Sequence, residues 1–140
     1  MASAAVIPRF AGSGDRARLA GRVLSGLVVL FLLFDGAMKL VPLAVVTDTM
    51  AQLGWPVDSA TARTLGVLTI AGALLYAMPR TAVLGAILLT GYLGGAVATH
   101  LRIGSPLFSH VLFGVYVGAL AWGGLWLRDP RLRALIPAAR

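Results

Sequence analysis

The sequence contains no cysteine, and this absence removes several classes of chemistry at once. Disulfides, thiolate metal ligands and dithiol redox relays all require cysteine sulfur. Small four-helix membrane enzymes that pass electrons from paired cysteines to a quinone are therefore excluded. The absence leaves the compartment open, because a chain without thiols survives on either side of a membrane.

Charged residues are also scarce, at 12% of the 140 residues, and only five of them are acidic. A soluble domain has about a quarter charged residues and roughly half apolar ones. Here 59% of the residues are hydrophobic and the mean hydropathy is +0.88. The composition predicts a single all-α membrane domain over residues 1–140, a bundle of four transmembrane helices of about 20 residues each.

A signal-peptide cleavage site is missing as well. Residues 1–22 carry four arginines and precede an apolar run, which is how a signal peptide begins. No small-x-small pattern closes that run; Asp35, Lys39 and Pro42 do. We therefore expect a retained first span at about residues 18–41, preceded by a tail of residues 1–17, with Pro42 stopping or kinking the helix.

The next stretch has the pattern of a short amphipathic helix. Leu43, Val46, Met50 and Leu53 recur at helical spacing among polar residues, up to Gly54-Trp55-Pro56. Such a segment is too polar to span and is expected to lie in the membrane interface, between the first and second spans.

Turn residues divide the remainder into three further spans, expected at about residues 60–78, 82–101 and 107–127, before a tail of residues 128–140. Asp58 or Ser59 is a candidate cap for the second span, and Thr81 for the third.

The basic residues are distributed unequally between the two sides of the predicted bundle. Four spans place both termini on one side, and an excess of positive charge marks the cytoplasmic side. We therefore expect cytoplasmic termini in a multi-pass protein of the inner cell membrane, and no nucleic-acid partner for the net charge of +7. The side of the termini holds Arg9, Arg16, Arg18, Arg22, Arg80, Arg128, Arg131, Arg133 and Arg140, whereas the opposite side holds Lys39, Arg63 and Arg102.

This topology gathers the ionisable groups of the spans near the outer leaflet. Asp35 and Lys39 are four residues apart, so they lie on one helix face and can pair. Ionisable groups inside a span are costly and mark a functional-site hypothesis. The predicted pocket has Asp35, His100 and His110 as catalytic candidates, Lys39, Arg102, Gln52, Trp55 and Tyr92 as substrate-binding candidates, and no metal ligands.

Helical periodicity also predicts the directions of the two histidines. Gly114, Val117 and Gly118 follow on the face of His110, which therefore points into the bundle, whereas His100 lies nearly opposite the glycine stripe of residues 91–95. Both glycine stripes are expected to be helix-packing surfaces.

Several kinds of chemistry suit such a pocket. A histidine exchanges a proton near neutral pH, so the groups can protonate and deprotonate a quinone, an enol or an epoxide oxygen without a metal. Lys39 and Arg102 would stabilise a developing oxyanion. Two histidines could instead hold haem iron, although no further ligand spacing supports this. A structural reading is that Asp35 and Lys39 merely anchor the first helix near the interface.

Three short motifs resemble the DoxX-like membrane proteins over roughly residues 22–127: Gly36-Ala37-Met38-Lys39-Leu40, Gly54-Trp55-Pro56, and Gly91-Tyr92-Leu93-Gly94-Gly95-Ala96 running into Thr99-His100-Leu101-Arg102. The resemblance implies a compact four-helix membrane protein and points to Lys39, His100 and Arg102. The member that names the family is a small subunit of a thiosulfate:quinone oxidoreductase. Because this sequence shows no flavin, haem or iron–sulfur motif, redox work would need a partner subunit or a bound quinone.

Four functions remain compatible with the sequence. The leading one is a quinone-linked oxidoreductase subunit or small membrane enzyme that acts on a lipophilic small molecule. The second is a cofactor-free isomerase, hydrolase or cyclase. The third is a proton-coupled transporter, although the pairing of Asp35 with Lys39 and the strong charge bias argue against it. The fourth is a structural membrane subunit, working with a partner or as a homo-oligomer.

Overall fold

The computed structural model describes residues 12–41 and 43–135, which form helices and short turns without a β-strand. Four of the helical segments are long and apolar enough to cross a membrane, so the predicted fold class is confirmed. The helices are α1 (Gly12–Leu40), α2 (Ala44–Gln52), α3 (Ser59–Ala77), α4 (Ala82–Arg102), the π-helical turn η1 (Leu107–Val111), α5 (Phe113–Arg128) and α6 (Pro130–Leu135).

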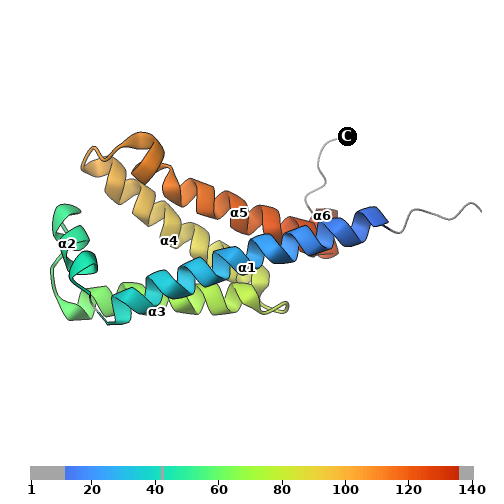
Figure 1. Cartoon of the computed structure of the whole chain (residues 1–140), viewed down its shortest axis with the longest axis horizontal. Coiled ribbons are helices and arrows are strands. Elements are labelled where there is room, and N and C mark those ends of the chain that lie inside the picture. Colours follow the sequence, from blue (N-terminus) through green and yellow to red (C-terminus); the bar gives the residue numbers. More distant parts are fainter. Residues whose placement is uncertain (1–11, 42, 136–140) are drawn as a thin grey trace, which may run out of the picture.

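The four long helices pack in a ring, in which α1 and α4 each contact both α3 and α5. The α4–α5 pair diverges from the α1–α3 pair toward the end of the molecule that carries α2 (Figure 1). We call this the α2 end, and the opposite end, where α1 begins and α6 lies, the tail end.

The tail end is closed by very close helix contacts. A Cβ atom added to Gly21 of α1 would lie 2.7 Å from the carbonyl oxygen of Gly124 in α5. A Cβ at Gly85 of α4 would lie 2.5 Å from Cα of Tyr76 in α3. Small residues let membrane helices approach through their backbones, so these glycines hold the ring together where it is narrowest.

Helix α2 closes part of the other end. Val46 and Met50 are buried against Ala62 of α3 and Met38 of α1. The apolar face that the sequence predicted for this short helix therefore packs on the bundle. Gly54, with φ of +69°, ends the segment by turning the chain toward Trp55.

Most helix boundaries agree with the sequence, but several details differ. The helix of the first span begins at Gly12, well before residue 18, and the C-terminal segment forms α6, with Leu132 buried in the core. Asp58 is the N-cap of α3, and its carboxylate accepts a hydrogen bond of 2.7 Å from Thr61 N.

Thr81 occupies the predicted N-cap position of α4, but its side chain does not act as a cap. The Thr81 side chain makes no cap hydrogen bond, because its hydroxyl donates instead to the carbonyl oxygen of Leu75, at 2.8 Å. The predicted stop at Pro42 and the terminal charges of Arg9 and Arg140 lie outside the residues that the structure describes.

Candidate functional site

A cavity of about 570 Å³ lies at the α2 end, between α1, α2, α4 and the start of α5. Its volume falls in the range of small-molecule pockets, roughly 300–1,000 Å³. Most of its lining is apolar. Six of the residues predicted from the sequence are among those that line it: Asp35, Lys39, Trp55, Tyr92, His100 and His110.

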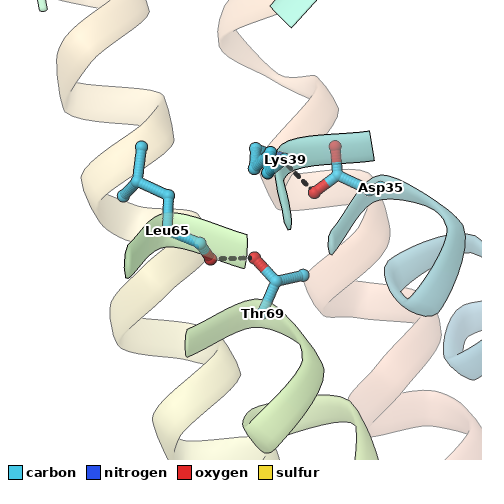
Figure 2. A network of polar contacts seen from close by, with 4 residues as sticks. All are labelled: Asp35, Lys39, Leu65 and Thr69. Carbon is cyan, nitrogen blue, oxygen red and sulfur yellow. Dashed lines mark hydrogen bonds and ion pairs between the residues drawn. The ribbon is translucent and has the colours of Figure 1, made fainter. Parts of the chain in front are cut away.

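Asp35 and Lys39 form one wall of this cavity. They lie one turn apart on α1, and Lys39 Nζ donates to Asp35 Oδ2 in a partly buried ion pair (Figure 2). Below them, the hydroxyl of Thr69 donates to the carbonyl oxygen of Leu65 in its own helix, at 2.8 Å, and Thr69 does not line the cavity. The pair therefore supplies a compact, nearly neutral acid–base unit in apolar surroundings.

The two histidines contribute from the opposite wall. Their ring centroids are 5.6 Å apart, and the rings are tilted by 60°. Nδ1 of His100 is 3.0 Å from Ser105 Oγ, and Nδ1 of His110 is 2.8 Å from Ser109 Oγ. Within residues 12–41 and 43–135, no hydrogen bond uses either Nε2. Each imidazole therefore has one nitrogen held by a serine and one available to a ligand.

The two histidines differ in burial, which the sequence did not predict. His100 is half-buried, whereas His110 is exposed. His110 belongs to the π-helical turn η1, and a π-turn holds more residues than an α-turn. His110 and Gly114 nevertheless both line the cavity, so they share the face that the sequence predicted. Ser105 and Ser109 were missed, although their sequence positions beside the histidines could have indicated them.

The two glycine stripes have different roles. Gly114 packs as predicted, since an added Cβ would lie 3.0 Å from the carbonyl oxygen of Leu93. The stripe of α4 does not pack against another described helix of the chain, because a Cβ at Gly91, Gly94 or Gly95 would meet nothing within 4 Å. Gly91 and Gly95 line the cavity instead. Their missing side chains make part of its volume.

Two predicted residues stand outside this cavity. Gln52 is exposed and lines neither of the two cavities of the α2 end. Arg102 is also exposed, and it lines a smaller adjoining cavity with Gly54, Trp55 and Thr99. The sequence correctly predicted the end of the bundle at which Arg102 lies, but Arg102 lines the smaller cavity and not the larger one.

A polar network at the tail end was not anticipated. Tyr76 is fully buried; its hydroxyl donates to the carbonyl oxygen of Ala121, at 2.7 Å, and lies 2.9 Å from Ser25 Oγ. Arg128 stacks over the Tyr76 ring and donates to its backbone carbonyl. Ser25, a single hydroxyl residue in an apolar run, is the sequence feature that could have indicated this network. The network joins α1, α3 and α5, and it lies away from the cavity.

The described residues contain no group of three or more His, Cys, Asp or Glu side chains that could hold a metal ion. A family model described as the DoxX-like family matches residues 23–124 of the chain. No curated protein and no solved structure gave a match.

Proposed function

The chain belongs to the DoxX-like family, and from that premise we propose that it binds a lipophilic small molecule in the larger cavity and exchanges protons with it there. The observation that carries the proposal is the convergence of Asp35, Lys39, His100 and His110 on one otherwise apolar cavity. These groups come from three separate elements, α1, α4 and η1. Titratable side chains gathered in an apolar pocket are the usual sign of a binding or catalytic site.

A lipid-dissolved ligand has a direct route to this cavity. Phe31 of α1 and Phe113 of α5 both line it, and their rings meet edge to face with centroids 5.5 Å apart. Phe31 and Phe113 are also exposed, by 40% and 45%. Because α1 and α5 are membrane-spanning helices, we infer that the ligand enters between these rings from the bilayer.

A quinone head group suits this lining, and we propose it as the bound cofactor of a quinone-linked oxidoreductase subunit. Lys39 Nζ and a histidine Nε2 are donors for carbonyl oxygens on opposite walls, and Gly91 and Gly95 leave room for a flat ring. A bound quinone would supply two-electron, two-proton redox chemistry. A partner subunit or a second copy of the chain would supply or receive the electrons.

The residues of this chain would handle the protons. A histidine Nε2 can pass a proton to or from a ligand oxygen near neutral pH. Ser105 and Ser109 fix the orientation of the rings through their contacts with Nδ1. The Lys39 ammonium stabilises negative charge on a ligand oxygen, and Asp35 keeps Lys39 in place.

The fluorescence of Trp55 can test this proposal, because Trp55 lines the cavity. A W122F/W126F background leaves Trp55 as the one tryptophan of the chain. We expect decylubiquinone to quench its emission saturably in wild type, and D35N or H100A to weaken binding about tenfold, as expected for one charge-assisted hydrogen bond.

D48N is the matched control, because Asp48 is exposed on α2 and lines neither cavity. It should bind like wild type. If decylubiquinone quenches Trp55 only in proportion to its partition into detergent, or if D35N and H100A bind like D48N, the proposal is wrong.

A second candidate is a cofactor-free isomerase, hydrolase or cyclase that acts on a lipophilic substrate. The observation that favours it is that the proton-transfer groups on both walls belong to this chain, so acid–base chemistry there needs no electron carrier. Saturable binding of apolar carbonyl or epoxide compounds, with no preference for decylubiquinone, would select this candidate.

A further inference from the structure

The smaller cavity at the α2 end, of about 280 Å³, adjoins the larger one. Trp55 and Thr99 line both spaces, and Gly54 and Arg102 complete the smaller one. In the part of the chain that the structure describes, the Arg102 guanidinium is the only charged group of this lining.

One hydrogen bond holds the Arg102 guanidinium in place and leaves most of its N–H donors unused. Arg102 Nη2 donates a hydrogen bond of 2.6 Å to the carbonyl oxygen of Leu53, which ties the end of α4 to the end of α2. A guanidinium has five N–H donors, and within the described ranges the others have no protein partner. Gly54 leaves room beside it, since an added Cβ would lie 3.3 Å from Nη2.

The acidic residues near this end are engaged elsewhere or lie apart. Asp35 pairs with Lys39, and Asp58 caps α3 through Thr61. Asp48 lines neither cavity, and no carboxylate of residues 12–41 and 43–135 forms an ion pair with Arg102. The smaller cavity therefore presents an uncompensated positive charge.

We propose that this smaller cavity binds a phosphate or carboxylate group at the mouth of the larger one, with Arg102 as its main contact. The planar guanidinium matches such an oxyanion through paired hydrogen bonds. Trp55 also lines this cavity and carries one indole N–H donor, whereas the Thr99 hydroxyl already donates to the carbonyl oxygen of Gly95, at 2.8 Å. The site goes beyond the proposed function, because it requires neither a quinone nor Asp35.

The position of Arg102 brings its guanidinium within reach of lipid head groups. Arg102 is the last residue of a membrane-spanning helix, so its guanidinium lies near the depth of lipid head groups. The phosphate of an anionic lipid and a free phosphate ion share the required chemistry. A binding experiment with both can distinguish these sources.

Native mass spectrometry in a neutral detergent gives that measurement. The probes are phosphatidylglycerol, phosphatidylcholine and inorganic phosphate, and the variants are R102Q, R102K and R63Q. The glutamine of R102Q retains an N–H donor for the Leu53 carbonyl but removes the charge. Arg63 is the matched control, because it is also exposed and donates to a single backbone carbonyl, that of Leu40 at 3.3 Å, but it lines neither cavity.

We expect wild type and R63Q to bind phosphatidylglycerol about tenfold more tightly than phosphatidylcholine, and R102Q to lose this preference. R102K keeps the positive charge but lacks the planar guanidinium, so it should keep part of the preference for phosphatidylglycerol. This variant serves as the test if R102Q does not fold. Displacement of phosphatidylglycerol by inorganic phosphate would identify the free anion as a ligand; lipid binding without displacement would identify the head group. Equal binding of both lipids by wild type, or an equal loss in R63Q, would overturn the proposal.

Discussion

Tyr76 shows at the scale of one residue how the tail end is held together. Its hydroxyl lies between Ser25 of α1 and the carbonyl oxygen of Ala121 in α5, and the side chain is fully buried. Removing this hydroxyl leaves the buried Ser25 hydroxyl without this partner and takes one hydrogen bond from the Ala121 carbonyl, which costs about 1–3 kcal/mol.

We therefore expect Y76F to lower the free energy of unfolding by about 1–3 kcal/mol, measured by SDS titration of mixed micelles. Y116F is the control, because Tyr116 is 46% exposed on α5. Equal stability of the two variants would mean that the Tyr76 network contributes nothing.

Asp58 makes the start of α3 sensitive to pH. Hydrogen bonds from the backbone and then the side chain of Thr61 hold the pKa of Asp58 below its ordinary value of 3.8. The carboxylate thus stabilises the folded state above pH 3.8, and this contribution is lost as the pH falls through the lowered value.

We expect the melting temperature of wild type to fall more steeply than that of D58N as the pH is lowered below about 4, because asparagine caps a helix without titrating. Parallel melting curves for the two proteins across this range would contradict the role assigned to Asp58.

At the scale of the helices, glycine residues have opposite roles at the two ends of the bundle: close packing at the tail end and open space at the α2 end. A Cβ at Gly21 of α1 would overlap α5, whereas one at Gly91 of α4 would point into open space. We expect G21A to lower the free energy of unfolding by about 1–3 kcal/mol through overpacking.

G91L should leave stability near that of wild type but fill the cavity and abolish saturable quenching of Trp55 by decylubiquinone. Normal quenching in a folded G91L protein would contradict the cavity-lining role of Gly91.

The seam between α1 and α5 offers a second test at this scale. The chain has no cysteine, so F31C/F113C places the only two thiols at the proposed entry. We expect a short, reversible bis-methanethiosulfonate cross-linker to slow ligand quenching of Trp55 at least about tenfold, and reductant to restore the rate. Cross-linker applied to F34C, an exposed position of α1 that does not line the cavity, should change nothing. An unchanged rate in the cross-linked pair would exclude this route.

At the scale of the whole molecule, the α2 end is hollow and the tail end is closed. The charge distribution predicts that the termini are cytoplasmic, which places the cavity toward the outer leaflet. A reporter fused after Arg140 should therefore be active when it requires the cytoplasm, and a reporter that works only outside the cell should be silent. The reverse result would place the cavity toward the cytoplasm.

Much of this architecture follows from local sequence. Apolar runs broken by Gly54, Pro79 and Gly104 predict the four spans, because length and hydropathy alone decide whether a helix can cross a bilayer. The meeting of Asp35, Lys39, His100 and His110 at one end follows from counting spans. Helix periodicity could not predict the π-helical turn at His110 or that Gly91 lines open space, because the second feature depends on how far α4 diverges from α1.

The sequence by itself therefore determined the class of the protein, its spans, the pairing of Asp35 with Lys39 and the end at which the polar groups gather. Each depends on hydropathy or on spacing within one helix. The tertiary structure alone decided that the polar groups line an open cavity, that Arg102 lies in a separate one, and that Tyr76 joins three helices at the other end. These features arise between helices, where crossing geometry and close glycine contacts set distances that no single segment encodes.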